Sequence, residues 1–143
     1  MIRKFHEDDL PAVMRIWLDS NLQAHSFISE EYWKGNFQMV MDMLPKVEVY
    51  VYEDPETRLI DGFVGITGDY IQGIFVRDGR RSSGIGKQLL DYVKGFKMSL
   101  SLYVYKNNSR AVSFYLREHF VIISESTDDY TDEKEYLMTC RCQ

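Results

Sequence analysis

A short basic loop with two glycines carries the clearest chemistry in the sequence. It follows the apolar run Ile74-Phe75-Val76 and precedes an amphipathic stretch. The free N–H groups at a helix start point toward an anion, and the helix dipole adds partial positive charge there. Glycine lets the backbone approach a ligand without a Cβ in the way. The loop therefore predicts a site for a phosphorylated ligand, made by Arg81, Ser82, Ser83, Gly84, Ile85, Gly86 and Lys87.

The spacing of the glycines excludes two nucleotide-binding loops. A Walker A loop needs a glycine five positions before its Gly-Lys-Ser/Thr run. Here that position holds Arg81, and Lys87 is followed by Gln88. The dinucleotide fingerprint needs a third glycine where this chain has Leu89. An ordinary strand-to-helix turn stays open as the alternative to a phosphate site.

A second motif lies downstream: Asn108-Ser109-Arg110-Ala111-Val112-Ser113-Phe114-Tyr115, after a strand-like run. Together, the Arg-x-x-Gly-x-Gly loop and this Asn-x-x-Ala-x-x-aromatic-Tyr pattern resemble the two signature motifs of the GNAT N-acetyltransferases, in the order that the family requires. The resemblance extends over nearly the whole chain. The chain most resembles small single-domain bacterial acetyltransferases of the YiaC/YjaB kind. These proteins carry a His-x-Phe-Ile/Leu segment, which here is His25-Ser26-Phe27-Ile28.

This resemblance implies a fold, a co-substrate and a reaction. The implied fold is the α/β GNAT acyl-CoA N-acyltransferase fold, a mixed and mostly antiparallel sheet flanked by about four helices. The implied reaction moves the acetyl group of acetyl-CoA to a primary amine, on a protein lysine, a protein N-terminus or a small molecule, by direct attack in a ternary complex. In the family the CoA arm enters a gap between two diverging strands. The residues implied to bind it are Ile74, Phe75, Val76, the loop from Arg81 to Lys87, Asn108 and Tyr115.

Two residues of the second motif have an implied role and a structural alternative. Tyr115 is the implied general acid, because a phenol with an ordinary pKa of about 10 is protonated at neutral pH and can donate to a leaving thiolate. Its alternative is a buried core aromatic. Asn108 is implied to contact the CoA arm, and a role as helix N-cap is equally open and compatible with that contact.

The general base is where the sequence departs from the family. Many relatives place a glutamate near the end of the strand before the phosphate loop, and this chain has Gln72 there. An amide cannot take a proton from an ammonium group, whose pKa in lysine is about 10.4. A water, Asp69, His25 or a C-terminal acid stays open as the base. His25 is expected to titrate near neutral pH, and packing beside Phe27 is its alternative.

The acceptor side is expected to lie outside both CoA motifs. Its wall is assigned to His25, Phe27, Trp33, Tyr70, Gln72 and Tyr103. An acidic turn follows near the C-terminus, with Asp128, Asp129, Asp132, Glu133 and Glu135. The turn either attracts a cationic amine or is merely solvated. An acyl-CoA-binding regulatory module with little or no catalysis is the alternative to an enzyme, and Gln72 keeps it open.

The surrounding elements follow from hydrophobic periodicity. A helix begins after Asp8 or Asp9, and a second begins after Ser29 and ends at Pro45. Strands are predicted near 1–5, 47–52, 59–67, 70–76, 100–105, 120–126 and 134–141. The phosphate loop opens a helix that runs to about 96, and a short helix that contains the second motif spans about 108–118. His119 stands where the family usually has a glycine, so we expect the turn after the second motif to be built differently.

Length and composition bound the remaining questions. A chain of 143 residues suits a single domain, 1–143, with one core. The formal net charge of −5 argues against a nucleic-acid partner and mildly favours a cationic substrate. No apolar run suits a membrane span or a signal peptide, and Cys140 and Cys142 suit a reducing cytoplasm. We expect no metal site, and a monomer or homodimer.

Overall fold

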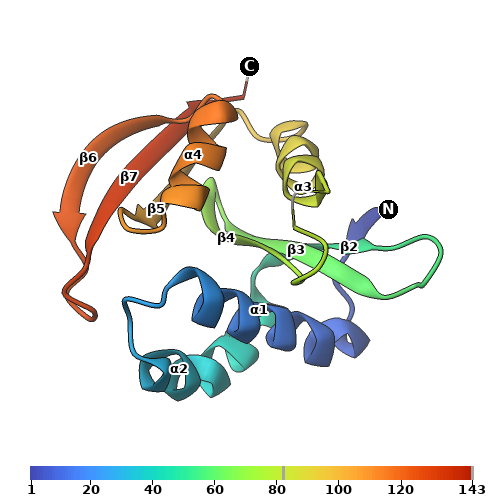
Figure 1. The fold of residues 1–143 in the computed structure, drawn as a ribbon. Coiled ribbons are helices and arrows are strands. Elements are labelled where there is room, and N and C mark those ends of the chain that lie inside the picture. The colour runs from blue at the N-terminus through green and yellow to red at the C-terminus, as the bar shows by residue number, and fades with distance from the viewer. Residues whose placement is uncertain (82, 143) are drawn as a thin grey trace.

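The computed structural model describes residues 1–81 and 83–142, which form one seven-stranded sheet with helices on both faces (Figure 1). The strands are β1 (Ile2–Lys4), β2 (Glu48–Glu53), β3 (Ile60–Thr67), β4 (Tyr70–Val76), β5 (Ser99–Tyr105), β6 (Val121–Thr127) and β7 (Lys134–Arg141). The α-helices are α1 (Leu10–Ala24), α2 (Glu30–Met43), α3 (Ile85–Lys94) and α4 (Ser109–Arg117), and short 3-10 helices cover Glu7–Asp9 and Leu44–Lys46. The element order predicted from periodicity is confirmed, with bounds that differ by one or two residues.

The first two helices begin at the predicted residues, but neither is capped by a side chain. α1 begins after Asp9, with Pro11 in its first turn, where a proline removes no helical hydrogen bond. The Asp9 carboxylate instead accepts from the His6 N–H at 2.8 Å and forms a two-bonded ion pair with Arg3. α2 begins after Ser29, whose hydroxyl makes no capping hydrogen bond. The chain thus enters α1 through an ion pair rather than through a cap.

Two apolar layers bury the two faces of the sheet. α1 and α2 cover one face, where Val51 and Phe63 belong to their core (Figure 1). α3 and α4 cover the opposite face, where Leu102 and Met138 are fully buried. Burying a side chain of this size contributes roughly 1.5–3 kcal/mol. β3 is buried along nearly its whole length because both of its faces are covered, whereas β5 alternates between buried and more exposed residues.

The sheet order is β1-β2-β3-β4-β5-β7-β6, and every neighbouring pair is antiparallel except β4 with β5. Within the described residues, β4 and β5 are paired only at Tyr70 and Ser101, and they diverge from there. On its other side β4 is paired with β3 from Tyr70 to Val76. The β4 edge that faces β5 is therefore without a strand partner beyond Tyr70.

A β-bulge lies at the start of this divergence. Gly73 pairs with Gly65 and Ile71 pairs with Ile66, so Gln72 is the extra residue on β4. A bulge bends the strand that carries it and increases its twist. Gln72 thus marks the point where β4 turns away from β5.

The turn after α4 shows that the prediction for His119 is wrong. Its φ is +74°, in the left-handed region where the family has glycine. The Phe120 N–H donates to the Tyr115 carbonyl at 2.9 Å, and the His119 N–H donates to the Leu116 carbonyl at 3.2 Å. This is the Schellman arrangement that commonly ends a helix. The chain therefore keeps this turn with a Cβ at positive φ. The imidazole itself is exposed.

Three further expectations concern membranes, metals and thiols. None of the helices in the described ranges is long and apolar enough to cross a membrane. Among the same residues, no group of three or more histidine, cysteine or acidic side chains is placed to hold a metal ion. Cys140 is buried, Cys142 is half-buried, and both are free thiols.

Candidate active site

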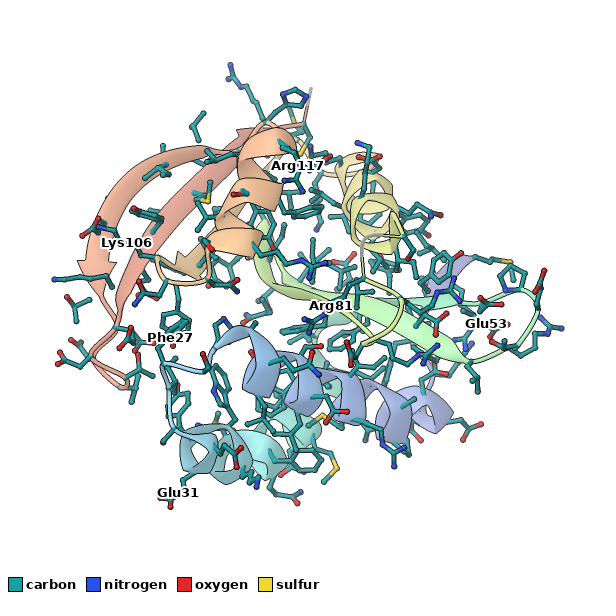
Figure 2. The ribbon with its side chains drawn as sticks, in the orientation of Figure 1. Phe27, Glu31, Glu53, Arg81, Lys106 and Arg117 are labelled. Carbon is teal, nitrogen blue, oxygen red and sulfur yellow. The ribbon has the colours of Figure 1, made fainter. Side chains whose placement is uncertain are left out.

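A cavity of about 390 Å³ lies beside the free edge of β4. Its lining comes from the end of α1, the second half of β4, the loop after β4, the first turn of α3, and α4. The predicted residues that line it are Ile74, Phe75, Val76, Arg81, Gly84, Gly86, Lys87, Asn108, Tyr115 and His25. Figure 2 shows two of its basic side chains, Arg81 on the loop and Arg117 on α4. The fold thus brings the two sequence motifs into one cavity.

Two described residues of the predicted phosphate loop, Ser83 and Ile85, are not among the lining residues. The Ile85 side chain is 2% exposed and belongs to the core under α3 and α4. The Ser83 hydroxyl donates to the Arg80 carbonyl, which ties the loop to itself. Ser82 lies outside the described residues. The anion-binding role predicted for Ile85 therefore depends on its backbone N–H alone.

The N-terminus of α3 lies at one end of the cavity, where the sequence predicts an anion site. Gly84 is its N-cap residue, with φ of +86°, and no side chain caps the helix. The first N–H groups of α3 are consequently available to a ligand. A Cβ at Gly84 would meet no atom within 4 Å, yet its φ strongly favours glycine. Gly86 has no such requirement, since a Cβ there would make an ordinary contact with Phe114 at 3.7 Å.

Several basic side chains lie around this end of the cavity, and Lys87 among them is already paired with carboxylates. Lys87 Nζ lies 2.9 Å from Glu118 Oε1 and 3.5 Å from Asp91 Oδ2, and these carboxylates raise the pKa of Lys87. Its charge is thus shared with Glu118 before any ligand arrives. Arg110 and Arg117 of α4 also line the cavity. The sequence reasoning missed Glu118 and these arginines, because no local pattern signals a partner on another helix.

The free edge of β4 fits an extended chain that carries amide groups. Backbone N–H and C=O groups of a strand pair with a peptide-like ligand as they would with another strand. The pantetheine arm of CoA carries two amides and ends in a thiol. The cavity continues from this edge to the N-terminus of α3. The strand edge suits the arm, and the helix N–H groups suit the diphosphate. The residues present therefore fit acetyl-CoA.

Asn108 is the N-cap of α4 and also contacts α1. Its Oδ1 accepts from the Ala111 N–H at 3.2 Å, which confirms the predicted cap. Its Nδ2 lies 3.1 Å from His25 Nε2. Because Oδ1 already accepts from the helix, Nδ2 is the donor and His25 Nε2 the acceptor. This contact joins the end of α1 to the start of α4 across the gap between β4 and β5.

His25 is enclosed by aromatic rings rather than by charges. It stacks on Trp33 with ring centroids 5.2 Å apart, and it meets Phe27 and Tyr105 edge-on. Burial lowers the pKa of His25 to about 4. The prediction that His25 titrates near neutral pH is therefore wrong, because a buried imidazole without an acidic partner loses its charged form. Through Asn108 it also borders the cofactor side, which the sequence did not indicate.

Tyr115 lies on α4 and lines the cavity while 7% exposed. Its ring packs edge-on against Phe114 and Phe120. Burial, with a smaller effect from Tyr70, raises the pKa of Tyr115 well above its usual value. The hydroxyl is therefore fully protonated at neutral pH. Tyr115 is both a core aromatic and a cavity residue, so the two sequence-based interpretations are compatible.

The residues assigned to the acceptor wall differ in exposure. Tyr103 is 47% exposed and lies 6.2 Å, between ring centroids, from the half-buried Tyr70. Phe27, in the α1–α2 connection, meets Tyr105 at 5.9 Å (Figure 2). Trp33 is 8% exposed, so it supports His25 from beneath rather than forming the surface.

Gln72 is exposed and does not line the cavity. Its Nε2 donates to Thr67 Oγ1 at 3.1 Å, across the turn between β3 and β4. An amide in this position has no proton-accepting chemistry to offer an ammonium group. The structure leaves the base to another group.

The acidic turn is connected to the aromatic wall by one strong contact. Tyr105 Oη donates to Asp128 Oδ2 at 2.5 Å. Glu135 is half-buried on β7, opposite Tyr105, and its burial together with Asp128 and Asp129 raises its pKa. Glu135 is also near enough to Tyr70 to contribute to the raised pKa of that phenol. Carboxylates thus border the same side as the tyrosines.

Comparisons with known proteins agree with this geometry. A family model described as an acetyltransferase (GNAT) domain matches residues 45–122. The chain belongs to the GNAT family of acetyltransferases. The peptidyl-lysine N-acetyltransferase YiaC of Escherichia coli K12 is 33% identical over 97% of this chain and 95% of its own length. YjaB of Salmonella typhimurium LT2, with the same activity in its name, is 27% identical over 90% of this chain and 88% of its length.

Solved structures confirm the GNAT fold. The solution structure of apo YjaB from Escherichia coli superposes with a TM-score of 0.86 at 23% identity, over 97% of this chain and 95% of that chain. An aminoglycoside 6'-N-acetyltransferase complexed with coenzyme A gives a TM-score of 0.69 at 14% identity, over 100% and 97%. Family and fold together make this chain an acetyl-CoA-dependent acetyltransferase.

Proposed function

We propose that the chain transfers the acetyl group of acetyl-CoA directly to a primary amine while both substrates are bound, and that this amine is a protein lysine. The proposal rests on one observation: the cavity unites the free edge of β4, the uncapped N-terminus of α3 and Tyr115. The names of YiaC and YjaB as peptidyl-lysine N-acetyltransferases support the choice of amine.

The chain's own residues bind and orient the donor. Acetyl-CoA supplies an activated acetyl thioester. The N–H groups at the start of α3, with Arg81, hold its phosphates, and the β4 backbone from Ile74 to Val76 pairs with its arm. Holding the donor in one orientation removes much of the entropic cost of the encounter.

Tyr115 is proposed as the general acid. Tyr115 lines the cavity and keeps its hydroxyl proton at neutral pH, so we propose that this proton reaches the departing thiolate. His25 is proposed as a positioning residue instead of the base, because a pKa of about 4 makes it a weak base and its Nε2 is engaged by Asn108. Among the bases left open by the sequence, Glu135 or a water that it orients fits the acceptor side best, since burial and nearby carboxylates raise the pKa of Glu135.

The acceptor side suits a cation. Glu135, Asp128 and the exposed ring of Tyr103 offer negative charge and an aromatic surface together. A lysine ammonium is attracted by such carboxylates and by the faces of such rings. A peptide that presents lysine is therefore preferred over a neutral amine.

The test is release of CoA thiol from acetyl-CoA in the presence of lysine-containing peptides, with their N-termini blocked in one set and free in another. Mass spectrometry then locates the acetyl group. We expect acetylation of the lysine Nζ in both sets, and none when lysine is replaced by norleucine. Tight acetyl-CoA binding without turnover on any amine would instead support the regulatory-module alternative.

A further inference from the structure

The loop between β4 and α3 is held from β3 by one buried carboxylate. Asp61 has no exposed surface. Its Oδ1 accepts from Arg77 Nε at 2.8 Å, and its carbonyl accepts from the Arg77 N–H at 2.7 Å. Arg80 Nη1 lies 3.1 Å from Asp61 Oδ2 as a second ion pair. Three contacts thus run from one β3 residue to the first half of the loop.

A second carboxylate completes this anchor. Asp54, the first residue of the β2–β3 turn, accepts from Arg80 Nη1 at 2.8 Å. Backbone N–H groups of Thr57 and Glu56, together with Arg80, lower the pKa of Asp54 to about 2. Two arginines therefore meet two carboxylates, and neither Arg77 nor Arg80 lines the cavity. These two positive charges of the loop are therefore paired within its own anchor.

The other end of the loop is set by the next residue of β3. A Cβ at Gly62 would lie 2.9 Å from the Phe75 carbonyl and 3.0 Å from Ile85 Cγ2. Glycine at this position lets the first residue of α3 pack directly on β3. Positions 61 and 62 thus fix both the start of the loop and the helix N-terminus that follows it.

We propose that Asp61 is the positioning residue of the diphosphate site: through Arg77 and Arg80 it holds the loop so that the α3 N–H groups face the diphosphate of acetyl-CoA. This inference rests on the proposed use of acetyl-CoA. Asp61 touches no ligand itself. It acts by keeping the loop in its binding conformation before the ligand arrives, which removes an ordering cost from binding.

The sign of the effect separates positioning from simple charge. Asp61→Asn removes a negative charge from the anchor. It takes the ion-pair partner from Arg77 and one of two partners from Arg80, which keeps Asp54. Electrostatics alone then predicts tighter binding. Positioning predicts weaker binding, because the released loop must be ordered when the ligand binds.

The experiment measures affinity for CoA by titration calorimetry, and steady-state kinetics with acetyl-CoA and with S-acetylpantetheine, which lacks the diphosphate. For Asp61→Asn we expect the Kd for CoA and the KM for acetyl-CoA to rise about tenfold or more, the factor that about 1.4 kcal/mol gives. The kcat at saturating acetyl-CoA and the kcat/KM for S-acetylpantetheine should stay unchanged. Asp54→Asn, which removes one of the two carboxylate partners of Arg80 and leaves Arg77 paired, should show a smaller rise in the same direction.

Asp9→Asn is the matched control, because Asp9 is a buried carboxylate paired with Arg3 that makes its bonds away from the loop. It should leave the affinity for CoA unchanged. The proposal is overturned if folded Asp61→Asn binds CoA as tightly as wild type or more tightly, or if it loses equally with S-acetylpantetheine. If Asp61→Asn does not fold, Asp54→Asn decides by the same criteria. A wild-type chain that does not bind CoA would overturn the proposed function instead.

Discussion

Replacing His119 by glycine should stabilise the protein. A non-glycine residue in the left-handed region costs roughly 1–2 kcal/mol. His119 carries that cost at φ of +74°, and within the described residues its exposed imidazole makes no hydrogen bond, ion pair or ring contact that glycine would lose. Glycine brings an entropic cost of about 0.5–1 kcal/mol, because it is freer in the unfolded chain. The net gain expected for His119→Gly is therefore about 0.5–1 kcal/mol.

This gain converts into a measurable shift. An unfolding entropy of about 2.1 cal/mol/K per residue over 143 residues gives about 0.3 kcal/mol/K. The Tm should consequently rise by about 2–3 °C, and the urea midpoint should rise at constant m value. Circular dichroism during heating and during urea titration measures both. Acetyl transfer should be unchanged, because the Phe120 N–H still donates to the Tyr115 carbonyl in the same turn.

His119→Ala is the matched control. It keeps the Cβ at positive φ and removes the imidazole, so its Tm should not rise. If His119→Gly melts at or below the wild-type temperature while His119→Ala also falls, the imidazole stabilises the turn and the strain argument is refuted.

Three other changes address the site. Tyr115→Phe should preserve CoA affinity and lower turnover by about 10²-fold or more, the usual scale for an acid–base group, and equal turnover would remove Tyr115 as the acid. Gly86→Glu should abolish CoA binding by adding bulk and negative charge at the anion site, while Gly86→Ala, whose Cβ meets Phe114 at 3.7 Å, should bind normally in calorimetry. The double change Asp128→Asn and Asp129→Asn should raise the KM for a lysine peptide at low salt and much less at high salt, because the Debye length falls from about 10 Å at 0.1 M to about 3 Å at 1 M. If the double variant and wild type have the same KM for the peptide at both salt concentrations, the turn is only solvated.

Local pattern was enough for the elements and for the residues that gather at the cavity. Helical spacing follows from the one buried face of each helix, and the alternation of β5 follows from its one more deeply buried face. The two motifs lie at the ends of β4 and β5, so the parallel direction of these strands brings them to one side. Asn108 could be recognised as a cap because its partner, the Ala111 N–H, is three residues away.

The titration predicted for His25 was wrong, whereas its alternative, packing beside Phe27, is confirmed. The low pKa also needs the rings of Trp33 and Tyr105, and Tyr105 comes from a distant strand that no local spacing indicates. The Lys87–Glu118 ion pair and the place of β7 between β5 and β6 were not predicted, because both join residues far apart in the chain. The prediction for His119 failed for another reason. The backbone turn stabilises more than one strained Cβ costs, so the residue type did not decide the conformation of the turn.

The divergence of β4 and β5 divides the sheet into a four-stranded and a three-stranded part that share one backbone pairing, Tyr70 with Ser101. The loop proposed to bind the phosphates belongs to the first part, whereas α4, which carries Tyr115, packs on β5 in the second. One apolar core joins the two parts where ladder hydrogen bonds do not, since it contains Ile71 of β4 together with Leu102 of β5 and Met138 of β7. A change in the volume of such a core residue should therefore change the angle between the two parts, and with it the distance from the β4–α3 loop to Tyr115.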